Sequence, residues 1–273
     1  MKQNSTKKLL STSLLLVLIA LVSLTAATTA WMTIADSTRL KTMRLDVTSG
    51  ANLRFDLDSH ETFEEYVKSL RLIDIADRIL RDQGYHPREN PLSPVTTTDC
   101  IHFTLENGEP AAKESYMEFV LHFMATDDMV VHLTTAGEEG TRIFSDEVSD
   151  IAKAMRISFT DDDSTAVYDP GMEPGSEEGL GGKIFGLARG NRIVYDASNT
   201  LFFLKAGVDK PVTVRIWLEG TDEICTDALR GVPYHIQLRF VGTDENGNLL
   251  EDSRTTTRRS AAATPTEERN ENK

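Results

Sequence analysis

Strict alternation of apolar and polar residues is the pattern that most restricts how this chain can fold. In the segment LRFDLD, the apolar residues Leu53, Phe55 and Leu57 alternate with charged residues. Successive side chains of a β-strand point to opposite faces, so a period of two predicts half-buried strands. Many such segments separated by polar turns favour an antiparallel β-sandwich over a parallel α/β sheet.

The alternation recurs along the chain and defines the predicted core faces. It is present in IHFTLE, YMEFVLHFM, MRISF, VTVRIWL and YHIQLRF, and the shorter apolar runs MVVHL, NRIVY and LFFL are further strand candidates. The residues predicted to face the core in the longer segments are Met117, Phe119, Leu121, Phe123, Met155, Ile157, Phe159, Val212, Val214, Ile216, Leu218, Tyr234, Ile236, Leu238 and Phe240. The sequence therefore predicts a mainly β fold.

Two segments have a different period and are predicted to be helical. Thr62–Arg81 is predicted to form one longer helix, because Thr62 and Glu65 have capping-box spacing and apolar residues recur near every 3.6 positions. Those apolar residues are Phe63, Val67, Leu70, Ile73 and Leu80. The segment SDEVSDIAKAM is predicted to form a short helix, capped by Ser145, that leads into the strand at Met155.

The N-terminal 30 residues have the pattern of a signal peptide. Three lysines lie among the first eight residues, and the dense apolar stretch Leu14–Leu24 is followed by the small residues TAATTA. This order predicts export through the Sec pathway with cleavage between Ala30 and Trp31. The alternative is an uncleaved anchor, since Leu9–Ala30 is just long enough to span a bilayer core of ~30 Å. In both cases only this segment is predicted to contact the membrane.

The rest of the chain is predicted to form one domain with a polar tail. Residues 31–251 form the predicted sandwich domain, and we find no internal repeat in it. Within it, residues 161–182 carry seven acids, no lysine or arginine, and several glycines and prolines, so they are predicted to form an exposed acidic loop. Residues 252–273 are polar and low in complexity, which predicts a disordered tail.

The charge of the chain argues against nucleic acid as a partner. The formal net charge is −14 and the pI is near 4.9. Binding to a phosphate backbone needs clustered lysine and arginine residues, and the sequence shows no such cluster in the predicted domain. An acidic surface favours solubility outside the cell, in agreement with the predicted export.

The two cysteines, Cys100 and Cys225, leave two alternatives open. In an exported chain a pair of cysteines suggests one disulfide, which would close a long loop and stabilise the fold by ~4 kcal/mol. The alternative is two buried free thiols. Two cysteines are too few for a structural zinc site unless histidines join them.

Metal sites have weak candidates in the sequence. The HExxH motif is absent, and His122 with His132 are the candidates for a site built on neighbouring strands, against the alternative of solvent-facing strand histidines. Asp161, Asp162 and Asp163 could provide carboxylates for calcium, against the alternative of a solvated turn. The Asn-Gly pair in GTDENGNLL favours a hairpin turn over a calcium loop. No other cofactor is indicated.

The segment VTVRIWLEGTDEIC combines a strand pattern with a turn pattern. Trp217 falls on the polar phase of the strand, so it needs a cover from the helix, the second sheet or a partner subunit. Gly220 is predicted to release the chain into a turn where Asp222 is solvated or bonds the backbone. The chain shows no nucleophile elbow, phosphate-binding loop or dinucleotide fingerprint, so no catalytic residue is predicted.

Several stretches, taken in order, resemble one family. The N-terminal lysines, the apolar run and TTAWMTIADSTR look like the SipW-type signal and mature start of TasA/camelysin-like proteins of Gram-positive bacteria. SYMEFVLHFMATDDMVVHL and SDIAKAMRISFTDDDSTAVYDPG are similar to its strand segments, and VTVRIWLEGTDEIC followed by IQLRF is similar to its C-terminal signature. The residues that carry this last likeness are Trp217, Glu219, Gly220, Asp222 and Cys225.

The resemblance implies a jelly-roll-like β-sandwich that is exported and held at the cell surface or in the biofilm matrix. Partners would then be further copies of the chain or other matrix and surface proteins. Some relatives assemble into fibres by strand donation, which would make Trp31–Val47 the donor candidate here. We therefore predict a non-enzymatic structural protein. The alternatives are a surface metalloprotease of camelysin type and a binding module for host or matrix polymers.

Overall fold

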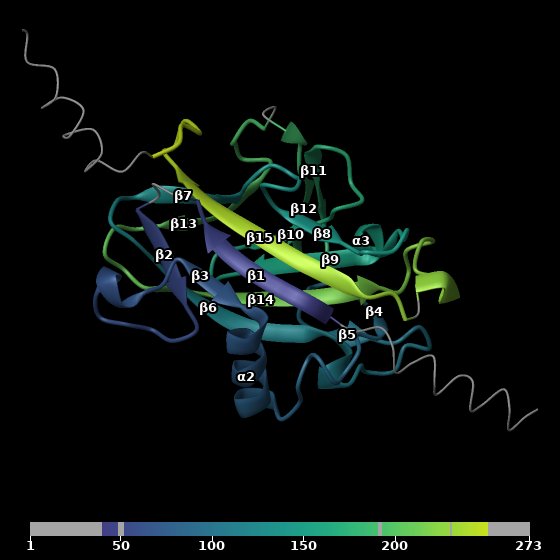
Figure 1. Ribbon diagram of the computed structural model, residues 1–273. Coiled ribbons are helices and arrows are strands. Elements are labelled where there is room, and N and C mark those ends of the chain that lie inside the picture. Colours follow the sequence, from purple (N-terminus) through teal and green to yellow (C-terminus); the bar gives the residue numbers. More distant parts are fainter. Residues whose placement is uncertain (1–39, 49–51, 191–192, 230, 251–273) are drawn as a thin grey trace, which may run out of the picture.

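The computed structural model describes residues 40–48, 52–190, 193–229 and 231–250, which form two β-sheets packed on one core (Figure 1). The predicted signal peptide 1–30, the cleavage site between Ala30 and Trp31, and the predicted tail 252–273 lie outside the described residues. The described residues therefore correspond to most of the predicted sandwich domain.

The first sheet joins strands from the two ends of the described chain. Its strands are β1 (Leu40–Val47), β3 (Ser69–Arg71), β7 (Met129–Leu133), β8 (Arg142–Phe144), β13 (Thr200–Leu204) and β15 (Tyr234–Thr243). The order is β13-β7-β15-β1-β3, and β8 also pairs with β15. Because β1 and β15 run parallel, the described chain begins at one end of the domain and finishes near the other (Figure 1).

The second sheet is built around the long strand β14. Its strands are β2 (Leu53–Asp56), β4 (Pro94–Thr97), β5 (Phe103–Thr104), β6 (Met117–Ala125), β9 (Met155–Thr160), β10 (Thr165–Tyr168), β11 (Gly175–Gly179), β12 (Gly182–Gly186) and β14 (Lys210–Glu219). The order is β11-β12-β10-β9-β14-β4-β5, while β6 pairs with both β14 and β2. One edge of β14 pairs with β9, and the other pairs first with β6 and then with β4.

The predicted mainly β sandwich, with one longer and one short helix, is confirmed. In detail the sheets are mixed, because β1 with β15, β10 with β12, and β14 with β4 are parallel pairs. Parallel neighbours need long connections. Strands β1 and β15 meet this condition because nearly the whole domain lies between them in sequence.

The core forms where the predicted apolar faces of the two sheets meet. All the core-facing residues predicted for YMEFVLHFM, MRISF, VTVRIWL and YHIQLRF are buried. Phe240 of β15 lies at the centre of an aromatic cluster. Its ring centroid is 5.6 Å from that of Phe55, 5.2 Å from that of Phe123 and 5.9 Å from that of Phe159, all three in the other sheet. These edge-on contacts join the two layers.

The predicted helix over Thr62–Arg81 is wrong in its first half. The Thr62–Glu65 capping box forms, but it closes a single 3-10 turn, η1 (Phe63–Glu65), and the chain is extended from Tyr66. Val67 then bridges to Phe55, and β3 pairs with β1, so sheet hydrogen bonds replace helical ones. The α-helix, α2 (Leu72–Gln83), buries a different set of residues. They are Leu72, Ile75, Ala76 and Ile79.

The second predicted helix is shorter than expected. Helix α3 (Ile151–Ala154) leads directly into β9, as predicted, but Ser145 does not cap it and accepts a hydrogen bond from the Glu147 backbone N–H instead. The remaining helical segments are the 3-10 turns η2 (Lys113–Ser115) and η4 (Asp227–Leu229). Within the described residues, no helix is long and apolar enough to cross a membrane.

The predicted acidic loop 161–182 contains two strands joined by turns. It contains β10, whose Ala166, Val167 and Tyr168 are buried, and the hairpin strand β11 that pairs with β12. The hairpin turns at Leu180 and Gly181, where φ is positive at both residues (53° and 77°), a requirement of the tight turns that match strand twist. The polar composition of this segment reflects an exposed edge strand. In contrast, IHFTLE forms only the two-residue β5, and the described part of NRIVY forms no strand.

We expect Phe240→Ala to lower the free energy of unfolding by about 3–5 kcal/mol, because it removes the ring on which three phenylalanines of the other sheet pack. Phe203→Ala is the matched control, since that ring is 46% exposed, and its effect is expected to stay within about 0.5 kcal/mol. Urea denaturation followed by circular dichroism measures both. Equal effects of the two substitutions would contradict this account of the core.

Candidate functional site

The segment VTVRIWLEGTDEIC is a strand and a corner, and its tryptophan is covered from within the chain. Trp217 is 0% exposed and packs with Val95, Cys100 and Phe103, whose ring meets it edge-on at 5.3 Å. The cover that Trp217 required is thus provided by β4, β5 and the loop between them. A partner subunit is not needed there.

The corner after Trp217 is held by two carboxylates. Glu219 accepts a hydrogen bond from the Trp217 indole N–H at 2.9 Å and another from the Thr221 hydroxyl at 2.7 Å. Asp222 accepts from the Ile224 backbone N–H and from Arg156, and the Gly220 N–H donates to the Val95 carbonyl. These hydrogen bonds satisfy the polar groups of the corner, so we interpret the segment as a structural element of the fold.

Both cysteines are free thiols in this structure, which is the second of the two alternatives that the sequence left open. Cys100 is buried beside Trp217, whereas Cys225 is half-buried at the margin of the main core. The two thiols belong to different apolar clusters. Burial raises the pKa of Cys100 to about 11, which makes it an inert structural thiol.

The predicted calcium candidates are engaged with a lysine. The Lys210 ammonium lies 2.8 Å from Asp161 and 3.3 Å from Asp163, and Asp161 also accepts the backbone N–H groups of Asp163 and Ser164. Partial burial opposes ionisation of Asp161, but Lys210 and these N–H groups outweigh it and lower its pKa. This arrangement is a turn closed by an ion pair, and Asp162 has no part in it.

The structure does not bring His122 and His132 together, because β6 and β7 belong to different sheets. His122 lies 2.9 Å from Asp209, which also accepts hydrogen bonds from Tyr66 and Ser59. His132, expected on a polar face, is buried because the segment before β13 covers this end of β7. Among the described residues, no three His, Cys, Asp or Glu side chains are grouped as a metal site.

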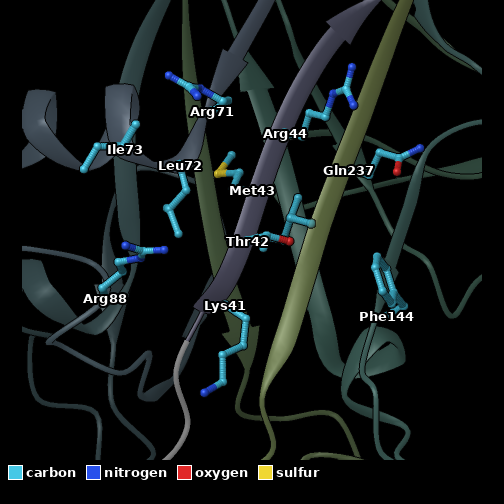
Figure 2. A pocket seen from close by; sticks show the side chains of 11 residues that line it. Lys41, Thr42, Met43, Arg44, Arg71, Leu72, Ile73, Arg88, Phe144 and Gln237 are labelled. Atoms are coloured by element: carbon cyan, nitrogen blue, oxygen red, sulfur yellow. The ribbon is translucent and has the colours of Figure 1, made fainter.

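The most distinctive surface feature is a groove of about 430 Å³ on the outer face of the first sheet (Figure 2). Strand β1 runs along its floor. On one side lie the β3–α2 junction and Arg88, and on the other lie Phe144 of β8 and Gln237 of β15 (Figure 2). The residues that matter for its chemistry are Lys41, Arg44, Arg71 and Arg88, and we call this surface the basic groove.

All four cations of the basic groove are exposed, and two of them, Arg44 and Arg71, are paired with acids. Arg44 lies 2.6 Å from Asp46, and Arg71 is 3.8 Å from Asp74, but no ion pair is formed by Lys41 or Arg88 within the described residues. Arg44 and Arg71 are also directly opposite each other in the β1–β3 pairing. Like charges placed opposite across two strands destabilise a sheet. An anion in the groove would relieve this repulsion.

Sequence reasoning missed the basic groove because its residues come from three separate segments. The cations of β1 occupy the polar phase of a strand, where a charged side chain is ordinary. A register irregularity near Thr42 places both Lys41 and Thr42 on the outer face, which alternation alone does not predict. In the sequence, these residues show only as scattered cations in an acidic chain.

A second pocket, of about 780 Å³, lies where α3 meets the ends of β10 and β12. It is lined by side chains of both signs. Arg142 and Arg189 are present, but so are Asp150 and Glu173, and Lys153 is paired with Asp150 at 2.8 Å. The second pocket is therefore lined by charged side chains of both signs, whereas the charged side chains that line the basic groove are all positive.

Comparison with known proteins finds no matching family model, no matching curated protein and no matching solved structure. The functional proposal therefore rests on the fold and the basic groove.

We expect the protein to contain two free thiols. Denatured protein, without reductant, should react with two equivalents of a thiol reagent, and native protein should react first at Cys225, which is half-buried. Burial raises the pKa of both thiols, so both native reactions should be slow at neutral pH. A mass lower by two hydrogen atoms, with no reactive thiol after denaturation, would show that the disulfide exists.

We expect His132 to make stability depend on pH. Burial lowers its pKa below 6.5, so the neutral ring is favoured in the folded state. Its contribution is therefore complete above the unfolded-state pKa and is lost as pH falls through the folded-state pKa. Between about pH 7 and 5, the free energy of unfolding should fall less steeply in His132→Gln than in wild type. The exposed His102→Gln serves as control, and an unchanged slope in His132→Gln would refute the assignment.

Proposed function

We propose that this chain is an exported, non-enzymatic structural protein of the cell surface or biofilm matrix that associates with copies of itself. The basic groove is the observation that carries the proposal. Four cations collected on one face of a chain with net charge −14 make a molecule whose surface is complementary to that of another copy. The resemblance to TasA/camelysin-like proteins supports the same reading.

The metalloprotease alternative gains no support from the candidate ligands. His122 bonds Asp209, His132 is buried against Asn199, and Asp161 is paired with Lys210. Each of these groups has a structural partner, and among the described residues they are not grouped as a metal site. A catalytic metal needs three protein ligands that converge on one open site.

The position of β1 shortens the segment that could be donated to another copy. Within the candidate Trp31–Val47, residues 40–47 form β1, which is paired with β15 on one side and with β3 on the other. Its residues Leu40, Met43, Leu45 and Val47 are buried in the core of the same chain. Removing β1 to donate it would break the sheet, so the donor segment is reduced to residues 31–39, which lie outside the described residues.

We expect the protein, purified as it is exported, to form assemblies visible by electron microscopy and by sedimentation. Deletion of 31–39 tests strand donation, whereas deletion of Trp31–Val47 would remove core strand β1 and unfold the domain. Loss of assemblies in the shorter deletion, with an unchanged circular dichroism spectrum, would support donation.

Two outcomes would contradict the proposed function. Casein cleavage that EDTA abolishes would favour the metalloprotease. A protein that stays monomeric but is retained on anionic polymers would favour the binding module.

A further inference from the structure

The acidic hairpin β11–β12 has carboxylates without cationic partners. Strand β11 is the outermost strand of the second sheet and pairs only with β12. Glu177 and Glu178 are exposed, and neither forms an ion pair among the described residues. Lys183, which lies opposite Glu178 in the hairpin, donates instead to the backbone carbonyls of Ala197 at 2.6 Å and Thr200 at 2.7 Å.

Three other acids of the same region have cationic partners. Asp161 and Asp163 are held by Lys210, and Asp169 lies 3.0 Å from Arg156. The hairpin therefore carries two of the four acids of this segment that form no ion pair among the described residues. Its free edge also presents backbone N–H and C=O groups that the second sheet does not use, the property that makes an edge strand a site for association.

The basic groove has the reverse composition. Its four cations stand on an outer sheet face, and Ile73 and Phe144 add apolar contact area at its sides (Figure 2). Association contacts gain orientation and rate when a positive surface meets a negative one. The groove and the hairpin meet that condition.

We infer that the basic groove binds the β11–β12 hairpin of a second copy of this chain. Successive side chains of a strand point to opposite faces. A hairpin entering the groove edge-on would thus present Glu177 to one side and Glu178 to the other. Arg71 and Arg88 stand on one side of the groove, and Lys41 and Arg44 rise from β1 (Figure 2).

This contact is directional, because it joins two different surfaces. The inference rests on the proposed function, because it specifies how the copies associate. The groove belongs to the first sheet and the hairpin to the second. Figure 1 shows β11 at the top of the molecule and α2, which borders the groove, at the bottom. A contact between two different surfaces leaves one free groove and one free hairpin in every pair, so it propagates head to tail into chains.

A charge-exchange experiment tests the contact. The groove variant carries Lys41→Glu, Arg71→Glu and Arg88→Glu, and the hairpin variant carries Glu177→Lys and Glu178→Lys. Each variant alone brings like charges together, so we expect association in sedimentation to weaken at least about tenfold. An equimolar mixture pairs the acidic groove of one variant with the basic hairpin of the other, so association should return in the mixture.

Matched controls separate this contact from a general effect of charge. Lys113, Lys205 and Arg81 are exposed cations outside the groove, and Glu106 and Glu245 are exposed acids outside the hairpin. The corresponding reversals to Glu and to Lys should leave association close to that of wild type. Circular dichroism checks that each variant is folded, and added salt should weaken wild-type association.

The outcomes distinguish the inference from the proposed function. If wild type associates and both variants associate equally well, or if both fail and their mixture does not recover, the groove–hairpin contact is wrong while self-association stands. If wild type does not associate at all, the proposed function fails and the inference fails with it. Retention of monomeric wild type on alginate, lost in the groove variant, would assign the groove to an anionic polymer instead.

Discussion

The packing of Phe240 on three phenylalanines of the facing sheet is the interaction on which the rest of the structure depends. It joins β15 to β2, β6 and β9 and therefore fixes the distance and orientation of the two layers. Strand β15 also pairs with β1, so the N-terminal strand is held in place through the C-terminal one. This explains why β1 is an integral strand of the core sheet in this chain.

Once β1 is fixed between β15 and β3, the outward side chains of the first sheet are fixed as well. Arg44 is placed opposite Arg71, and the irregularity near Thr42 brings Lys41 onto the same face. The domain tolerates like charges at this position in a chain whose net charge is −14. A local arrangement that lowers stability and has no evident structural role is a place where a functional role is expected.

The burial of Trp217 shows how a sequence signal can mislead about function. A tryptophan, three carboxylates, a glycine and a cysteine within nine residues suggest a site. In the fold, β4 and β5 cover that side of β14, and Glu219 and Asp222 hold the corner through local hydrogen bonds. The residues that make the segment resemble a family signature are therefore explained by architecture.

The sequence correctly predicted the mainly β class, the core-facing residues of the long strands and the hairpin turn at the Asn-Gly pair. These follow from alternation and turn chemistry, which act over a few residues. The helix predicted over Thr62–Arg81 was wrong at η1 and β3, because hydrogen bonds between strands formed there in place of helical ones. Only the tertiary structure decided the parallel pairing of β1 with β15, the cover over Trp217 and the basic groove. Each of these joins residues far apart in sequence, and no local pattern encodes which distant segments will become neighbours.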